Sequence, residues 1–342
     1  MDLIHPPYIW FGGKRRVAPL VWDALGDVDH YVEPFFGGGS VWLLRPHAPR
    51  LETVNDYDGF VANFWRAVQA EPEAVADAMN WPINEVDLEA RHRALCRMPD
   101  KAEFLDRMKH DPRHYDVERA AWWCWGLNAW IGSGWCGGEY WPGEAGKSCG
   151  SGVCDGANHL PHLSAGQGVH RQLPHLGNAA QGETERRGEN LRAWMQAIAD
   201  RLRNVRVCCG DWARVCTNGA TAHWKTVGIF LDPPYSFDVG NRNKSIYRCE
   251  DGVIAHRVRE YCLSRTAEPR YRIVLAGYEG EHDELEDAGW RVVSWKANGG
   301  FSNFGQAKNG KVNKHRERLW FSPSCQCVEQ PQEQDLFAEV TA

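Results

Sequence analysis

The chain carries, at residues 227–235, the sequence Val-Gly-Ile-Phe-Leu-Asp-Pro-Pro-Tyr. A short apolar run of this kind is typical of a strand that is covered on both faces, as in a parallel sheet. Asp232 follows the run directly, and ligand sites in open α/β sheets lie at the carboxyl ends of strands. The stretch therefore predicts an α/β fold with a site at the end of the strand 227–231.

The tetrapeptide Asp232-Pro233-Pro234-Tyr235 offers hydrogen-bond acceptors beside an aromatic ring. Two successive prolines restrict the backbone and remove two N–H donors. The Asp232 carboxylate and the Pro233 carbonyl remain as acceptors, and such a pair suits a planar group that bears an exocyclic amine. The alternative interpretation is a rigid turn after a buried strand.

A second motif lies near the start of the chain. Residues 30–36 predict a strand that runs into Gly37-Gly38-Gly39, and a helical stretch is expected from Ser40. Glycines after a first strand allow a ligand to approach the backbone closely, although this spacing is not the dinucleotide fingerprint. Asp56 ends the next predicted strand, at 51–55, where it could hold ribose hydroxyls or cap a helix.

The remaining pattern alternates helices and strands, which indicates a mostly parallel sheet. Further elements are expected as helices at 58–70, within 71–131, and at 190–203, 251–265 and 281–288, and as strands at 205–209, 272–276, 290–297 and 316–321. We predict one discontinuous catalytic domain (1–74 and 190–322), interrupted by an inserted region at 75–189. Residues 323–342 form an acidic tail that is predicted to be disordered.

The order of these motifs resembles that of the Dam-type, alpha-class DNA adenine methyltransferases. The segments Leu275-Ala276-Gly277-Tyr278 and Arg318-Leu319-Trp320-Phe321 resemble those of phage and prophage members of that family. The resemblance depends on Trp10-Phe11-Gly12-Gly13-Lys14, on Pro34-Phe35 with Gly37 and Gly39, on Asp56, and on Asp232-Pro233-Pro234-Tyr235. It covers residues 1–70 and 190–322, with the family's target-recognition region in the place of 75–189.

This resemblance implies a Rossmann-like methyltransferase fold, a mixed sheet with helices on both faces, and S-adenosylmethionine as cofactor. It implies that the cofactor is bound by Trp10, Lys14, Phe35, Gly37, Gly39, Asp56, Asp211 and Asp232. Asp232 and Pro233 would accept the amine hydrogens of an adenine in double-stranded DNA, and Tyr235 would stack on the flipped base. A restriction endonuclease is a possible functional companion.

Three other functions stay open on the sequence. A cytosine-4-amine DNA methyltransferase would use the same geometry, although Asp at position 232 favours adenine. An RNA methyltransferase is disfavoured by the motif order, and a catalytically silent DNA-binding relative is disfavoured by the complete motif at 232–235.

The formal net charge of −6 does not exclude a DNA partner, because binding depends on a local patch. The basic residues of one short segment could contact phosphates, or could form a solvated face: Lys308, Lys311, Lys314 and Arg316.

The chain has 12 cysteines at irregular spacing and no export signal at its start, so reduced thiols in a cytoplasmic protein are expected. Cys149, Cys154, His159 and His162 are weak candidates for a zinc site, with Cys136 as an alternative ligand. The tryptophans at 122–141 predict a buried helix, with Trp135 and Trp141 as candidates for DNA contact.

No apolar run reaches the roughly 18 residues that a membrane span needs. The acidic tail carries one apolar pair, Leu336 and Phe337. This pair resembles the short peptides that bind the bacterial sliding clamp, although the usual leading glutamine is displaced by one position.

Overall fold

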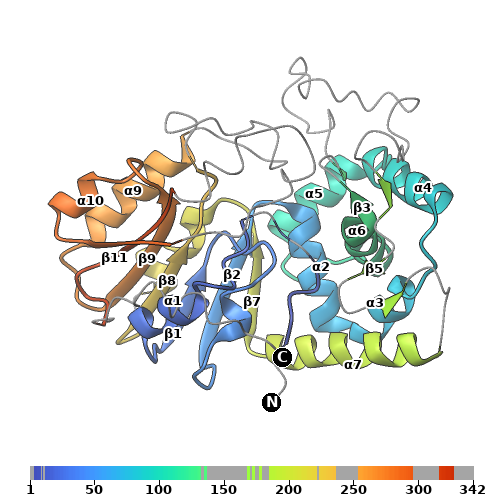
Figure 1. The fold of residues 1–342 in the computed structure, drawn as a ribbon, viewed down its shortest axis with the longest axis horizontal. Helices are drawn as coiled ribbons and strands as arrows, with labels where there is room; N and C mark the ends of the chain where they lie inside the picture. Colours follow the sequence, from blue (N-terminus) through green and yellow to red (C-terminus); the bar gives the residue numbers. More distant parts are fainter. Residues whose placement is uncertain are drawn as a thin grey trace.

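The structure is a computed structural model that describes residues 4–8, 10, 12–131, 135–136, 168–169, 172–173, 177–178, 185–221, 223–235, 253–295 and 316–326. Its centre is a seven-stranded sheet with the strand order β10-β11-β9-β8-β1-β2-β7 (Figure 1). The strands are β1 His30–Glu33, β2 Leu51–Asp56, β7 Val205–Cys209, β8 Val227–Leu231, β9 Tyr271–Tyr278, β10 Arg291–Ser294 and β11 Glu317–Phe321.

The pairings from β9 through β8, β1 and β2 to β7 are all parallel. Only β11 runs against its two neighbours, β9 and β10. This mixed sheet confirms the predicted α/β class. All seven strands come from residues 30–56 and 205–321, on either side of the predicted insertion.

Side chains alternate between the two faces of the sheet and form two apolar cores. Tyr31 and Phe230 belong to the core beneath α1 (Ala18–Leu25) and α2 (Gly59–Ala70). Their neighbours Val32 and Ile229 belong to the core beneath η3 (Trp212–Val215) and α9 (Ile254–Arg265). Strand β8 is buried on both faces, which explains why its sequence is apolar without interruption.

A helical region lies beyond β7 and α2 (Figure 1). It comprises α3 Pro72–Met79, α4 Glu85–Cys96, α5 Lys101–His110, α6 Val117–Ala129 and α7 Glu185–Leu202, with the short strands β3 Trp130–Ile131, β4 Gly168–Val169, β5 Gln172–Leu173 and β6 Gly177–Asn178. The helices share the core of α2. Trp123, Trp125 and Trp135 are all buried, which confirms the buried-helix interpretation and gives Trp135 no exposed face for DNA.

Four helical elements differ from the sequence prediction. The helix expected from Ser40 is only a 3₁₀ turn, η1 (Trp42–Leu44), because Pro46 disfavours helical backbone at the residue before it. The helix expected at 281–288 is reduced to α10 (Glu284–Asp287), and Gly289 follows with a φ of +86°. Helix α1 was not predicted, and α8 (Asn218–Thr221) is a single turn.

No helix of the described residues is long and apolar enough to cross a membrane.

Glu52 on β2 joins the sheet to α7 through buried charges. Its carboxylate accepts from Trp42 Nε1 at 2.7 Å, from Arg45 Nη1 at 2.9 Å and from Arg201 Nη2 at 2.9 Å. Burial alone would raise the pKa of Glu52, but the two guanidinium groups outweigh it and the pKa is lowered. This carboxylate therefore stabilises the fold above its ordinary pKa, and the contribution is lost as the pH falls through the lower pKa of the folded state.

We expect Glu52→Gln to lower the free energy of unfolding by about 3–5 kcal/mol at neutral pH, because it leaves two guanidinium groups without their buried counter-charge. Urea unfolding measures this loss, and the variant should be less sensitive to acid than the wild type. The control is Asp200→Asn, which removes the exposed pair with Arg203 and should cost under about 1 kcal/mol. Equal losses of stability in Glu52→Gln and Asp200→Asn would contradict the role of Glu52 as a buried counter-charge.

Candidate active site

The carboxyl ends of the parallel strands bring distant parts of the sequence to one edge of the sheet. Strand β1 leads into the glycine turn at 37–39, β2 ends at Asp56, and β8 ends just before Asp232. Strand β11 runs the other way, so its first residue, Glu317, lies at the same edge, paired with Tyr278 at the end of β9.

The backbone conformation of the turn at 37–39 and its packing against Trp10 require glycine. Gly37 and Gly39 have φ values of +46° and +64°, in the left-handed region. A Cβ on Gly37 would lie 2.4 Å from the indole of Trp10. The Gly37 carbonyl accepts from Tyr8 Oη at 2.7 Å and from Trp65 Nε1 at 3.0 Å. Trp10 therefore packs directly on the turn.

Asp56 connects this turn to β2. Its Oδ2 accepts from the Gly37 N–H at 2.9 Å and its Oδ1 accepts from the Asp58 N–H at 2.8 Å. The cap of helix α2 is Asp58, whose carboxylate accepts from the Phe60 N–H. Asp56 is thus not the cap of helix α2, and its carboxylate instead holds the backbone of the glycine turn.

Lys14 lies at the centre of a charged cluster with Asp232, Tyr235 and Glu317. Its Nζ is 2.9 Å from Asp232 Oδ1 and 3.9 Å from Glu317 Oε2, and its side chain is only 3% exposed. The Tyr235 hydroxyl donates to Glu317 Oε2 at 2.8 Å and lies 3.3 Å from Asp232 Oδ1. Lys14 Nζ also lies 5.2 Å from the centre of the Tyr235 ring, which meets Tyr278 edge to face at 4.5 Å.

Burial and neighbouring charges both shift the pKa values of Lys14 and Glu317. Burial alone lowers the pKa of Lys14, but the carboxylates of Asp232 and Glu317 outweigh it and the pKa is raised. Burial raises the pKa of Glu317, and Asp232 adds to that rise although Lys14 and Tyr235 oppose it. With both acids ionised, the three charged groups carry one surplus negative charge.

Phe35 and Asp211 lie at the neighbouring strand ends but are not part of this cluster. The Phe35 ring is 6.0 Å from that of Trp212. Asp211 caps η3 by accepting from the Ala213 N–H at 2.9 Å, and its Oδ2 pairs with Arg257 at 3.2 Å. Asp211 therefore already has a cationic partner.

Glu317 is the site residue that the sequence analysis missed. It is the first residue of an antiparallel strand, whereas the acids predicted from the sequence lie at the ends of parallel strands. Its signal was a single acid among basic residues, two positions before the apolar run Leu319-Trp320-Phe321.

Of the four basic residues predicted to contact phosphates, the structure describes only Arg316. Its guanidinium lies 5.6 Å from the ring centre of Tyr278, so it borders the charged cluster. The other predictions lie outside the described residues: Lys308, Lys311 and Lys314 as phosphate contacts, Cys149, Cys154, His159 and His162 as zinc ligands, Leu336 and Phe337 as a clamp-binding pair, and Trp141.

Residues 10–91 match the family model described as D12 class N6 adenine-specific DNA methyltransferase. The matched part includes Trp10, Lys14, the glycine turn and Asp56, and it ends well before Asp232. No curated protein matches the chain significantly. The match confirms the resemblance to adenine-specific enzymes and gives no support to the cytosine or the catalytically silent alternative.

We expect Gly37→Ala to lower the free energy of unfolding by about 1–3 kcal/mol, because it combines a positive φ with a collision against Trp10. Urea unfolding tests this. Gly13→Ala is the control, since the nearest atom to its added Cβ would be 3.5 Å away. A Gly37→Ala protein as stable as Gly13→Ala would show that the turn is not constrained as described.

Proposed function

We propose that this chain is an N6 adenine-specific DNA methyltransferase that transfers the methyl group at the carboxyl ends of β1, β2 and β8, as the match of residues 10–91 supports. The observation that carries the proposal is the Lys14–Asp232 pair, which joins the segment before β1 to the Asp-Pro-Pro-Tyr motif after β8 at 2.9 Å. The family implies S-adenosylmethionine as methyl donor and DNA as substrate.

We propose that the glycine turn and Asp56 hold the nucleoside part of the cofactor. The backbone at Gly37 and Gly39 can approach a ligand closely, and the Asp56 carboxylate beside this turn would accept from ribose hydroxyls. Trp10 and Phe35 would supply apolar contact. Asp211 would reach the adenine of the cofactor only if it shares its carboxylate with Arg257 or exchanges that partner.

The charge of the cluster suits a sulfonium cofactor. Bound S-adenosylmethionine supplies an electrophilic methyl group on a positively charged sulfur. Asp232 and Glu317 exceed Lys14 by one negative charge, so the cluster favours a cation placed beside it. Lys14 keeps the two acids together, because without its ammonium group the repulsion between the two carboxylates would be uncompensated.

Asp232 and Pro233 would orient the adenine amine. Within the described part of the chain, both polar contacts of Asp232 use Oδ1, which leaves Oδ2 for an amine hydrogen. The Pro233 carbonyl would accept the second hydrogen. Two such bonds localise the nitrogen lone pair and direct it at the methyl group, and positioning of this kind contributes up to roughly 7–11 kcal/mol in favourable cases.

Tyr235 and the basic segment would act on the DNA. Tyr235 would stack on a base turned out of the duplex, with its hydroxyl held by Glu317. Arg316, with Lys308, Lys311 and Lys314, would contact phosphates. We assign the recognition of the target sequence to the region 75–189, between the two halves of the proposed catalytic domain 1–74 and 190–322.

The other sequence-based expectations stay predictions. They are phage origin, a restriction endonuclease companion, a cytoplasmic location, and a clamp contact through Leu336 and Phe337.

We expect Asp232→Asn to lower methyl transfer by about 10²–10³-fold, because it removes a charged acceptor from the amine. The assay transfers labelled methyl groups from S-adenosylmethionine to unmethylated genomic DNA, and mass spectrometry identifies the modified nucleoside. The control is Asp287→Asn, an exposed acid on α10. Methylated adenine lost only in Asp232→Asn supports the proposal, whereas unchanged transfer would refute the role of Asp232.

We expect Glu317→Gln to lower the maximal rate about tenfold, by freeing the Tyr235 hydroxyl and unbalancing Lys14. The raised pKa of Glu317 means that its carboxylate is lost at a pH above the ordinary value of 4.5. The wild-type rate should therefore fall as the pH drops towards 4.5 from above, and this fall should move to lower pH in Glu317→Gln. Glu103→Gln, an exposed change on α5, should keep the wild-type profile. An unshifted pH dependence of the rate in Glu317→Gln would count against the role given to the Glu317 carboxylate.

A further inference from the structure

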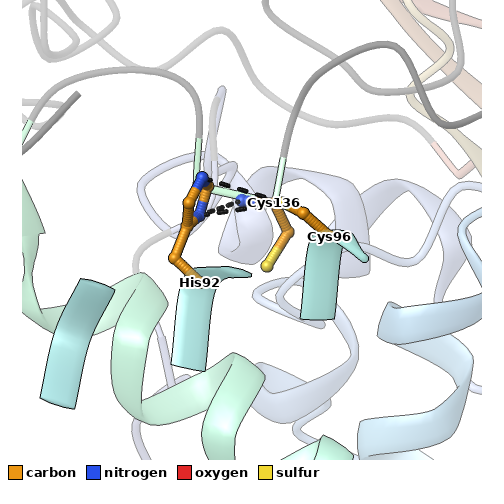
Figure 2. Close-up of side chains that lie close together, drawn as sticks. All are labelled: His92, Cys96 and Cys136. Carbon is orange, nitrogen blue, oxygen red and sulfur yellow. Dashed lines mark hydrogen bonds between the residues drawn. The ribbon is translucent and has the colours of Figure 1, made fainter. Parts of the chain in front are cut away.

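His92, Cys96 and Cys136 form a second cluster of chemically active side chains, in the helical region (Figure 2). Their candidate ligand atoms all lie within 4.8 Å of one another. His92 and Cys96 are four residues apart on α4, so they lie on the same side of that helix. Cys136 reaches them from the segment after β3. We infer that these three residues bind a zinc ion.

The distances are close to those of a zinc site. Tetrahedral zinc with Zn–N near 2.0 Å and Zn–S near 2.3 Å separates a nitrogen from a sulfur ligand by about 3.5 Å. Cys96 Sγ lies 3.7 Å from His92 Nε2 and 3.9 Å from Nδ1. Movements of a few tenths of an ångström therefore bring the donors to ligand distance.

The ligand atoms, two sulfurs and one nitrogen, indicate which metal the site would bind. Two thiolates and one imidazole favour zinc over magnesium or calcium, which prefer oxygen ligands. The three side chains fill three positions of a tetrahedron, and the fourth takes a further donor. In the structure, His92 Nδ1 accepts from the Cys136 N–H at 3.3 Å, which places the lone pair on Nδ1. Zinc binding would replace this hydrogen bond by coordination through Nδ1.

The surroundings hold the ligands in place. Cys136 is 1% exposed and Cys96 is 6% exposed. The His92 ring stacks on Trp130 with 5.0 Å between ring centres, and Trp135, which also contacts Trp130, lies 5.3 Å from the His92 ring at a tilt. Trp135 donates in turn to the Trp123 carbonyl at 3.0 Å. Aromatic packing of this kind fixes ring orientation around a metal ligand.

The backbone at Cys136 gives independent support. Its φ of +52° is the only positive value among the described residues other than glycine. A side chain rarely adopts this conformation unless the surroundings impose it, and such positions cluster at ligand sites. Here the conformation turns the thiol towards α4. A bound zinc ion would fasten this segment to the helix.

The site goes beyond the proposed function and does not depend on it. It differs from the zinc ligands suggested by the sequence, because Cys136 is joined with His92 and Cys96 rather than with Cys149, Cys154, His159 or His162.

The test measures the metal content of the full chain, purified with reductant, by mass spectrometry of the elements. We expect about one zinc per chain in the wild type and at least a tenfold loss in Cys96→Ser and in Cys136→Ser. Cys208→Ser on β7 is the matched control and should keep its zinc, because Cys208 is outside the cluster. Zinc retained in Cys96→Ser and Cys136→Ser would overturn the proposal.

A cobalt(II) titration of the metal-free protein provides a second, spectroscopic readout of the site. We expect the strong visible absorption of tetrahedral cobalt with thiolate ligands, and its loss in the two serine variants. Zinc should also raise the melting temperature of the wild type and of Cys208→Ser, but not of Cys96→Ser or Cys136→Ser. Absence of the cobalt bands, or a wild-type mass showing a Cys96–Cys136 disulfide in place of the metal, would refute the site.

Discussion

The buried ammonium of Lys14 is the interaction on which the proposed active site depends. It is 2.9 Å from Asp232 and 3.9 Å from Glu317, and it brings together a segment before the first strand, a motif after β8 and the start of β11. Without it, the negative charges of the half-buried Asp232 and the buried Glu317 would repel each other with no cation between them. The Lys14 side chain is almost wholly withdrawn from water, so its ammonium group needs the two carboxylates as partners.

The sheet supplies the geometry that makes this interaction possible. Parallel strands place Asp56 and Asp232 at one edge, and the reversed β11 adds Glu317 there. Strand β8 is buried on both faces, so the residue that follows it emerges at a fixed position between the two cores. The glycine turn is fixed in the same way, because Tyr8, Trp10 and Trp65 all contact Gly37.

The strand ends and motif residues could be predicted from the sequence because local pattern determines them. The apolar run before Asp232 predicts β8. The strand predicted at 51–55 places Asp56 at its carboxyl end. Glu317 could not be predicted, because its place at the site depends on the reversed direction of β11. The partnership of Cys136 with His92 was also beyond the sequence, since it depends on how α4 packs against α6 and on a positive φ at Cys136.

The most direct test of the central claim is a crystal structure of the chain with S-adenosylhomocysteine, the demethylated form of the cofactor. Our account predicts that the ribose contacts Asp56, that the ligand lies against the glycine turn, and that its sulfur faces the cluster of Lys14, Asp232 and Glu317. A ligand bound away from the carboxyl ends of β1, β2 and β8 would contradict the account, as would a sulfur turned away from Asp232.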